Sequence, residues 1–511
     1  MELRRDRDRR DGRHRVGSGG TSACKVAEAA SDAVPPCTKK APPDSFDPVV
    51  QWSWTAPDGT YPYSGSYIMP LVGNFTDDNG DGAVDLCDVP DVIVTTLPIN
   101  QGDTGGRMYL LAGDTGAQEL EFAEMVDSMI TPAFGDIDGD GLPEVVAVTI
   151  VLTDGGTKAE RRLIAFENDG SVKWHGDVTA EASGSYCTAV ALYDLDGDGS
   201  VEIISAFEVY DKDGHRLWGV PGNEVDDLGP TFWCPTATAA DLDGDGMLEV
   251  IFDRGAYHAD GTLYWEVPGP PAQPHVANLD DDPEPEVVFT TKDGFTVLEH
   301  DGKVKVGPFS PPGAMNIPNC LNKPGVIHDF DGDGKADVAL GSCTDFTVYD
   351  PKALSPHWSA AVQDSTGLAT GTAFDFFGDG VADAIYADET KVFVFDGATG
   401  AIEMTAPRPS STIIEYPVVA DVDNDGSAEI VIAANNDFGG PKPPAIIVLR
   451  DSQDRWVQAR RVWNQHAYHV TNVREDGTIP AHMKNSWQLL NTFRTNAQIE
   501  GAGDCNPESP K

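Results

Sequence analysis

The sequence predicts an all-β fold, a β-propeller whose ring consists of eight four-stranded blades. Two observations lead to this prediction: an acidic, glycine-containing motif recurs eight times along the 511 residues, and short apolar segments typical of β-strands flank the copies. Between the copies, no segment of comparable length has the apolar spacing of an amphipathic helix. Four short strands per repeat close naturally into a ring of radial sheets, which leaves no long sheet edge exposed.

The repeating motif is an acid, any residue, an acid or Asn, any residue, Asp, Gly, two further residues and a final acid, followed by a β-branched apolar run. Its eight copies begin at residues 77, 136, 194, 241, 278, 329, 375 and 421. The starts lie about 49 residues apart on average, and a propeller blade needs about 40–50 residues. The count therefore predicts eight blades; seven blades, with one motif as decoration, is the alternative.

Each period has the same order of strands. One apolar strand enters the motif, another leaves it, and a third runs into a hairpin, as in 163–174 (LIAFENDGSVKW), where Asn-Asp-Gly supplies the positive φ of a tight turn. The last strand often ends in Trp, which we expect to pack between blades and not to stack on sugars: Trp174, Trp218, Trp265, Trp358 and Trp456. Residues 49–54 (VVQWSW) resemble this last strand but precede the first motif. They are therefore expected to complete the final blade and close the ring.

The acidic motif has the chemistry of a calcium loop. Carboxylates at positions 1, 3 and 5 converge only where the backbone turns tightly, which Gly at position 6 permits. The carbonyl of position 7 and the acid at position 9 complete a shell of hard oxygens, which suits Ca²⁺ better than the stricter octahedron of Mg²⁺. An EF-hand is excluded, because it needs flanking helices and an acid at position 12, where only the first copy has one, Asp88. Eight matched copies beside strands also argue against acids that merely solvate surface turns.

We therefore predict up to eight calcium ions, held between the first two strands of each blade. The expected ligands are the side chains at positions 1, 3, 5 and 9: Asp77, Asn79, Asp81 and Asp85; Asp136, Asp138, Asp140 and Glu144; Asp194, Asp196, Asp198 and Glu202; Asp241, Asp243, Asp245 and Glu249; Asn278, Asp280, Asp282 and Glu286; Asp329, Asp331, Asp333 and Asp337; Asp375, Asp379 and Asp383; Asp421, Asp423, Asp425 and Glu429. The seventh copy lacks one ligand, because Phe377 occupies position 3.

These repeats resemble the FG-GAP/VCBS family, the calcium-binding blades of integrin α-chain propellers and of many bacterial surface proteins. Pro132-Ala-Phe-Gly-Asp136, Pro417-Val-Val-Ala-Asp421 and the loops themselves carry the resemblance, which covers about residues 70–450. It implies a propeller with calcium on one face. It implies no particular ligand, because a fold of this kind serves many functions.

Composition restricts the partners. The chain has 83 acidic residues against 35 Lys and Arg, a formal net charge of −48, so nucleic acids and anionic membrane surfaces are unsuitable partners and cations are needed to offset self-repulsion. No apolar run is long enough for a transmembrane helix. Residues 1–16 carry seven Arg and no apolar core follows them, so they do not read as a secretory signal.

The eight cysteines suggest an oxidising compartment, and hence an extracellular or cell-surface location. Cys187 and Cys234 each lie seven residues before a motif, so they are expected to bridge adjacent blades. The other pairings expected from position are Cys320 with Cys343, Cys24 with Cys37, and Cys87 with Cys505. A zinc site is not expected, because the chain has no CxxC pair.

The chain is expected to divide into a flexible tail at 1–48, the propeller at 49–465 and a ring-closing segment with a tail at 466–511. Residues 461–494 break the repeat pattern, and we expect them to pack across the ring closure and satisfy loop backbone. A metal or catalytic pair formed by His466 and His469 is the weaker alternative.

Three functional hypotheses remain. The first is an extracellular recognition, adhesion or scaffold module with an unidentified protein or glycan ligand. The second is a calcium-dependent polysaccharide lyase or other secreted carbohydrate-active enzyme. The third is a purely structural unit or a fragment of a larger adhesin. The sequence favours binding, because it contains no nucleophile elbow, no HExxH motif and no P-loop.

Overall fold

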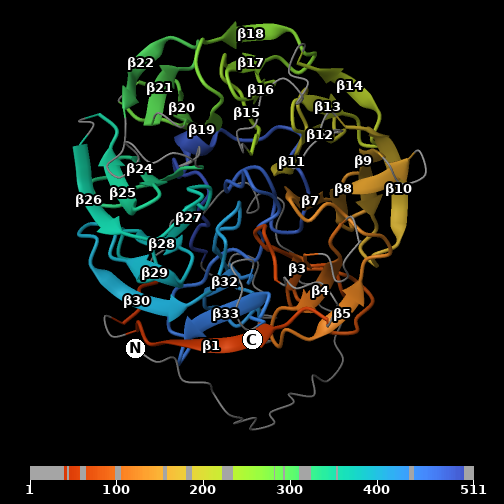
Figure 1. The fold of residues 1–511 in the computed structure, drawn as a ribbon, viewed down its shortest axis with the longest axis horizontal. Helices are drawn as coiled ribbons and strands as arrows, with labels where there is room; N and C mark the ends of the chain where they lie inside the picture. Colours follow the sequence, from red (N-terminus) through yellow and green to blue (C-terminus); the bar gives the residue numbers. More distant parts are fainter. Residues whose placement is uncertain are drawn as a thin grey trace, which may run out of the picture.

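The structure is a computed structural model. It describes residues 39–42, 45–57, 65–97, 105–153, 158–179, 187–220, 234–280, 282–291, 294–309, 324–352, 355–436 and 442–499. Eight antiparallel sheets stand around a common axis and form a closed ring (Figure 1). The prediction of an eight-bladed β-propeller is therefore confirmed.

Each blade runs from an innermost first strand to an outermost fourth strand. Blades 1 to 4 consist of β2 (Leu71–Gly73), β3 (Asp91–Thr95), β4 (Met108–Ala112) and β5 (Gln118–Glu121); β7 (Ala133–Gly135), β8 (Glu144–Thr153), β9 (Lys158–Phe166) and β10 (Val172–Val178); β11 (Thr188–Tyr193), β12 (Glu202–Ser205), β13 (Glu208–Tyr210) and β14 (Arg216–Gly219); β15 (Thr238–Ala240), β16 (Glu249–Ile251), β17 (Gly255–Tyr257) and β18 (Leu263–Glu266).

The other four blades repeat the same order. They consist of β19 (Gln273–Ala277), β20 (Glu286–Thr291), β21 (Gly294–Glu299) and β22 (Val304–Phe309); β23 (Val326–His328), β24 (Asp337–Gly341), β25 (Asp345–Asp350) and β26 (Ser355–Ala361); β27 (Gly371–Phe374), β28 (Asp383–Ala387), β29 (Lys391–Phe395) and β30 (Ile402–Pro407); β31 (Val418–Ala420), β32 (Glu429–Ala433), β33 (Ile446–Asp451) and β1 (Pro48–Trp54). A two-residue strand, β6 (Ile130–Thr131), pairs in parallel with β11, and η2 (Ser486–Gln488) is a single 3₁₀ turn.

The ring is closed by the two ends of the repeat region, as the sequence predicted. β1 pairs antiparallel with β33, from Pro48 opposite Asp451 to Trp54 opposite Ile446. The last blade therefore contains three strands from the end of the repeat region and one from its beginning. This pairing covers the edge that β33 would otherwise expose.

The fourth-strand tryptophans pack between blades. The indole N–H of each reaches a carbonyl in the hairpin of the following blade: Trp52 to Gly113 (2.6 Å), Trp218 to Ala259 (2.8 Å), Trp265 to His300 (2.8 Å) and Trp358 to Gly397 (2.5 Å). Trp174 lies against Gly214, where an added Cβ would come within 2.6 Å of the ring. The expected inter-blade role is therefore present in these residues.

Trp456 does not belong to this series. It follows β33, the third strand of blade 8, and packs against Phe376 and Phe46 with ring centroids 4.5 and 5.2 Å away. The fourth-strand Trp of blade 8 is Trp52, because β1 supplies that strand from the other end of the chain.

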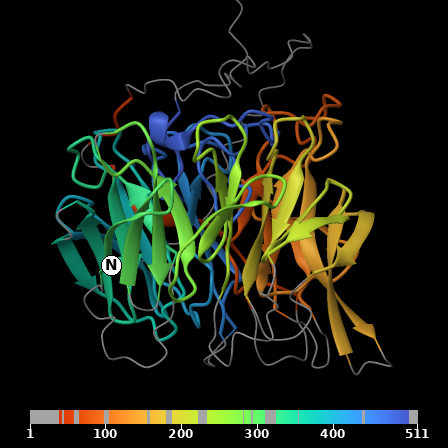
Figure 2. The same ribbon diagram turned by 90° about the horizontal axis from the view of Figure 1, so that it is seen from above.

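The chain after β33, residues 452–499, is named here the C-terminal segment. It lies at one end of the ring axis and is shown in dark blue in Figure 2. It meets the inner strands through backbone hydrogen bonds: Trp463 with Val72 in both directions, Asn464 O with Phe134 N, Phe493 with Ile327 in both directions, and Arg460 O with Asp421 N just after β31. These contacts reach blades 1, 2, 6 and 8.

Side chains extend the C-terminal segment to the other four blades. Gln465 Oε1 accepts from Leu192 N in blade 3, and Trp487 belongs to a hydrophobic cluster that includes Ala240 and Leu242 of blade 4. Further contacts pair Asn491 with Asn278 of blade 5, and Thr372 of blade 7 donates to the Arg494 carbonyl. The expected packing across the ring closure is thus one part of a contact with all eight blades.

Two histidines of this segment, His466 and His469, are buried. Burial lowers the pKa of His469 to about 3 and that of His466 well below its usual range. His469 stacks between Tyr193 and Phe493, at centroid distances of 6.5 and 5.9 Å. Both imidazoles are packed inside the ring, away from solvent.

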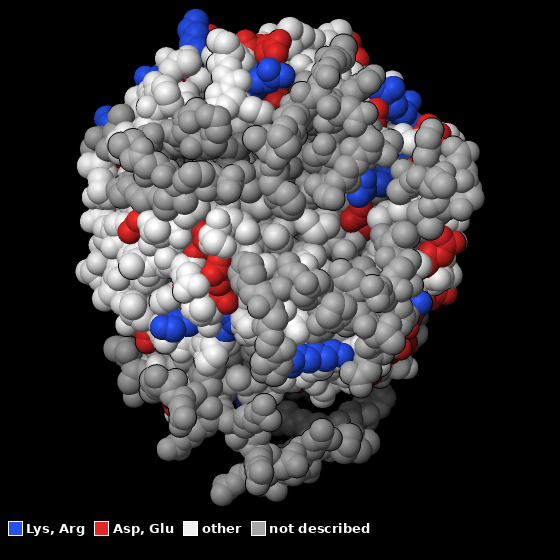
Figure 3. Space-filling view, viewed as in Figure 1, with Lys and Arg blue, Asp and Glu red and all other residues white. Residues whose placement is uncertain are grey.

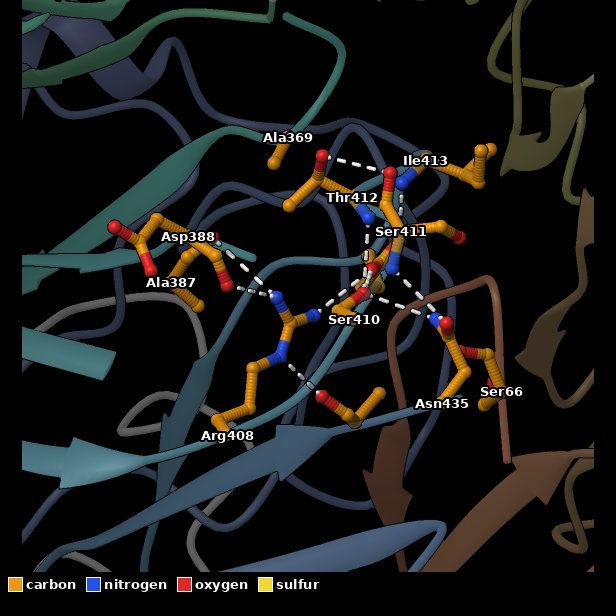
Figure 4. A network of polar contacts seen from close by, with 12 residues as sticks. Ser66, Ala369, Ala387, Asp388, Arg408, Ser410, Ser411, Thr412, Ile413 and Asn435 are labelled. Carbon is orange, nitrogen blue, oxygen red and sulfur yellow. Dashed lines mark hydrogen bonds and ion pairs between the residues drawn. The ribbon is translucent and has the colours of Figure 1, made fainter. Parts of the chain in front are cut away.

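The opposite end of the ring is tied by a buried polar network, shown in Figure 4. Arg408 pairs with Glu415 at 2.8 Å and donates to the carbonyls of Ala433 and Asp388. Asn435 of blade 8 donates to the carbonyl of Ser66, which precedes blade 1. The side chains of Arg408 and Glu415 are at most 1% exposed, so this network connects blades 7, 8 and 1 without facing solvent.

Candidate metal centres

All eight predicted loops lie at one end of the ring. Each loop connects the first strand of a blade to the second, because the motif begins at or just after the end of the first strand. The C-terminal segment lies at this same end, since Gly477 O accepts from Asp136 N and Gln458 Nε2 donates to Asp421. The expected position of the loops, between the first two strands, is observed.

Within a loop, hydrogen bonds from backbone amides orient the carboxylates toward the centre of the loop. In blade 2, Asp136 accepts from Gly139 N (2.7 Å) and Gly141 N (3.0 Å), and Asp138 accepts from Asp140 N at 3.1 Å. Both glycines have a positive φ, 82° and 91°, which a β-carbon would strain. The same hydrogen bonds recur in blade 3 around Asp194. The turn that the spacing predicted is therefore formed.

The acid at position 9 opens the second strand and closes the loop. One of its oxygens accepts the amide of position 2, as in Glu144 with Ile137 (3.0 Å), Glu202 with Leu195 (2.8 Å) and Glu429 with Val422 (2.9 Å). The surroundings of the other oxygen differ between blades: Glu144 Oε1 accepts from Lys173 at 3.0 Å, whereas Glu429 Oε1 has no hydrogen-bond partner among the described residues.

Positions 1, 3 and 9 come together in space. Ligand atoms lie within 4.8 Å of one another in groups that include Asp136, Asp138 and Glu144, and Asp194, Asp196 and Glu202. In blade 4 the oxygens of Asp241, Asp243 and Asp245 form such a group. The sequence therefore identified carboxylates that the fold gathers.

Two of the groups contain a histidine that the sequence analysis missed. His258 Nδ1 lies 2.9 Å from Glu249 in blade 4, and His357 Nε2 lies 3.0 Å from Asp337 in blade 6. For His357 the sequence offered one signal, its position directly before the fourth-strand Trp358. A side chain at that position faces the loop of its own blade.

Blade 1 departs from the prediction. Its motif, Asp77 to Asp85, lies inside a longer connection, and β3 begins at Asp91. Asp91 accepts from Phe75 N at 2.9 Å and so occupies the structural place of a position-9 acid. Asp88 instead accepts the amides of Asp78, Asn79 and Asp85 and holds the inserted turn together.

Blades 5 and 7 form variant loops. Asn278 Oδ1 accepts from Asp280 N at 3.1 Å, so an amide oxygen replaces the first carboxylate of blade 5. In blade 7, Asp375 accepts from Gly380 N at 2.8 Å. Burial, with repulsion from Glu403 of the fourth strand, raises the pKa of Asp383 well above its usual range.

The position-9 acids are costly to ionise without a cation. Burial raises the pKa of Glu144 to about 7, and burial with repulsion from Asp196 and Asp194 raises that of Glu202 to about 8. A carboxylate whose pKa is raised in this way is stabilised by any positive charge placed beside it.

Blade 8 has the most deeply buried loop. Asp421 and Glu429 are fully buried, and Asp421 Oδ1 and Glu429 Oε1 have no hydrogen-bond partner among the described residues. Burial and the neighbouring loop carboxylates raise the pKa of Asp421 and of Asp425 to about 7 and that of Asp423 to about 6. Buried oxygens that lack a partner are the observation expected of a loop that folds around a cation.

One predicted disulfide is confirmed. Cys187 and Cys234 are bonded, with Cα atoms 4.6 Å apart, and join the segments that lead into blades 3 and 4. Cys87 and Cys343 each take part in a disulfide as well. Their expected partners, Cys505 and Cys320, lie outside the described residues, as do Cys24 and Cys37.

No protein-family model matches the chain, and no curated protein matches it. Among solved structures, the V. cholerae biofilm matrix protein Bap1 is similar, with a TM-score of 0.72 and 21% identity, covering 89% of this chain and 99% of that chain. The rhamnogalacturonan lyase YesW has a TM-score of 0.51 and 17% identity, covering 78% of this chain and 75% of that chain. At these identities the likeness concerns the fold.

Fold and loops together define a class: this is an eight-bladed β-propeller with an acidic loop at the equivalent place in each blade. The matrix protein and the lyase are similar to it in fold. Among the described residues, no helix has the length and apolarity needed to cross a bilayer. On the face shown in Figure 3, the described Lys and Arg side chains are scattered and form no continuous patch.

Proposed function

We propose that the protein is an extracellular, calcium-stabilised propeller of the FG-GAP/VCBS type that acts as a recognition, adhesion or scaffold module for a protein or glycan. The single observation that carries the calcium part is blade 8. There, Asp421 and Glu429 are fully buried beside two further loop acids, and one oxygen of each has no partner among the described residues.

Calcium suits these loops because their donors are oxygens. Asp421, Asp423, Asp425 and Glu429 supply carboxylates, and Ca²⁺ takes six to eight oxygen ligands in a flexible shell. A bound ion would supply the positive charge that offsets the repulsion among these acids. The residues present therefore fit the ion.

The proposed location follows from two properties of the chain. The Cys187–Cys234 disulfide is typical of an oxidising compartment. A net charge of −48 is tolerated more easily where millimolar calcium is available, because extracellular sites bind at about 10⁻⁴–10⁻³ M.

Calcium binding is tested at blade 8 by Asp421→Asn. The variant is expected to bind one calcium ion fewer per chain than the wild type, measured by equilibrium dialysis with elemental analysis, because it removes a buried carboxylate that lacks a second partner. Asp169→Asn is the matched control, since Asp169 is an exposed hairpin acid outside the loops and an Asn there can still accept from Ser171 N. A wild-type protein that binds no calcium would refute the calcium part of the proposal.

The recognition part is tested by screening the calcium-loaded protein on glycan and protein arrays, with and without a chelator. Binding that is lost on chelation supports the module. Parallel incubation with pectic and other acidic polysaccharides tests the lyase alternative, because a lyase releases unsaturated products that absorb ultraviolet light. Turnover of any of these substrates would contradict a function limited to binding.

A further inference from the structure

The fourth strand of every blade carries a β-bulge at the equivalent residue. At this point one residue of the fourth strand has no partner in the third strand, so the register shifts by one; blades 2 and 5 have a second shift further along the strand. The bulged residues, in blade order, are Glu119, Lys173, Leu217, Tyr264, Lys305, His357, Glu403 and Gln51. A bulge changes the direction of a side chain that would otherwise alternate between the two faces of the sheet. Here the same change of direction is repeated in every blade.

The bulged side chains are turned toward the acidic loop of their own blade. Gln51 donates to Asp423 at 2.7 Å in blade 8, and His357 lies 3.0 Å from Asp337 in blade 6. Positions 3 and 9 of the loop are the recurring partners. The chemical identity of the bulged residue therefore decides what each loop meets on its outer side.

In blade 2 the bulged residue brings a positive charge. Lys173 Nζ lies 2.7 Å from Asp138, 3.0 Å from Glu144 and 3.0 Å from Glu167. Its side chain is only 17% exposed, so the ammonium is held within the group of acids. Two of the four expected calcium ligands of this blade already have a cation beside them.

Blade 5 repeats this arrangement independently. Lys305 Nζ contacts Asp280, lies 2.7 Å from Glu286 and also pairs with Glu299. Positions 3 and 9 are again the partners. Two blades that are not adjacent thus place an ammonium group at the same point of the loop.

Blades 3 and 8 bring no charge to this point. Leu217 is 53% exposed and offers no polar atom to the loop of blade 3. Gln51 brings a neutral amide in blade 8, where Glu429 Oε1 has no partner among the described residues. At the bulge, the acids of these two blades therefore lack the ammonium group that blades 2 and 5 have. The positive charges that act on the loop of blade 8 come from Arg450 and Arg461, outside the fourth strand.

We propose that Lys173 and Lys305 act as built-in counter-ions, so that blades 2 and 5 fold without calcium while blades 3 and 8 require it. The inference rests on the proposed calcium function and deepens it. An ammonium group and a calcium ion compete for the same oxygens at positions 3 and 9. With those two acids engaged, the loop retains too few free carboxylates for the six or more oxygens that calcium takes.

The test counts calcium ions per chain at a fixed free calcium concentration, by equilibrium dialysis and elemental analysis. Lys173→Gln and Lys305→Gln introduce into blades 2 and 5 the residue type that blade 8 has at its bulge. Each variant is expected to bind one more calcium ion than the wild type, and the double variant two more. Lys303→Gln is the matched control, because Lys303 lies two residues from Lys305, is 79% exposed and does not contact the loop acids.

The reverse substitution tests the same inference in a blade that needs the ion. Leu217→Lys is expected to lower the count by one, because it supplies blade 3 with an ammonium group. If the Lys173 and Lys305 variants do not fold, the calcium count of Leu217→Lys still tests the counter-ion role.

The outcomes separate the two proposals. Folded lysine variants with an unchanged count, or a Leu217→Lys protein that retains every ion, would overturn the counter-ion role while leaving calcium binding intact. A wild-type protein and variants that all bind no calcium would instead refute the proposed function.

Discussion

Replacing Glu475 by glutamine is expected to destabilise the protein by about 3–5 kcal/mol, the range for breaking a buried ion pair from one side. Glu475 lies in the C-terminal segment and binds two arginines: its carboxylate is 2.7 Å from Arg460 Nε and 2.7 Å from the backbone N of Arg461. The side chains of Arg460 and Arg461 are 4% and 1% exposed. The isosteric change removes the carboxylate that pairs with both buried guanidinium groups.

The measurement is the free energy of unfolding in guanidinium chloride at saturating calcium. Asp476→Asn is the control, because Asp476 is the exposed neighbour of Glu475. Its side-chain oxygen accepts from Thr478 N, and an Asn side chain can accept the same hydrogen bond. A Glu475→Gln protein as stable as this control would show that the C-terminal segment contributes little to holding the ring together.

In calcium-free protein, raising the pH from 5 to 8 is expected to lower stability by several kcal/mol. The unfolded pKa of Asp is about 4, whereas burial raises those of Asp421 and Asp425 in the folded protein to about 7. Between these values the folded state binds more protons than the unfolded state, so stability falls as the pH rises from about 4 to 7. For Asp421 alone the shift corresponds to roughly 4 kcal/mol.

Calcium is expected to remove most of this slope, because the ion takes the place of the protons. The measurement compares unfolding free energies at pH 5, 6, 7 and 8 for protein freed of calcium on a chelating resin and for protein saturated with calcium. Asp421→Asn should flatten the calcium-free curve, and Asp169→Asn should not. Equal slopes with and without calcium would contradict the assignment of blade 8 as a cation site.

The fold was predictable because each blade contains the same motif of residue types, which can be recognised in the sequence. The eight starts of the motif fix the number of blades, and the placement of 49–54 before the first motif predicts how the ring closes. The turn residues and strand lengths are local properties, so they can be read in sequence order. In blade 1 the acid that opens the second strand is Asp91, because an inserted turn follows Asp85, and the calcium role expected of Asp85 stays a prediction.

Other parts of the site were not predictable in the same way. A bulge is a property of strand register. No neighbouring sequence signal directs Lys173 to Glu144, 29 residues earlier, or Lys305 to Glu286, 19 residues earlier. The path of the C-terminal segment could not be read because its contacts join residues hundreds of positions apart, as between Arg461 and Leu86. Its polar composition predicted hydrogen bonds to loops but not which blades would supply them.

The C-terminal segment also sets the timing of folding. Its residues leave the ribosome after the strands of all eight blades that they contact, and the final blade needs β1, the first strand of the ring to emerge. β1 must therefore wait, with an unpaired edge, until β33 has been synthesised. Maturation of such a ring is a late, slow and aggregation-exposed event, because closure depends on contacts between the two extremes of the chain.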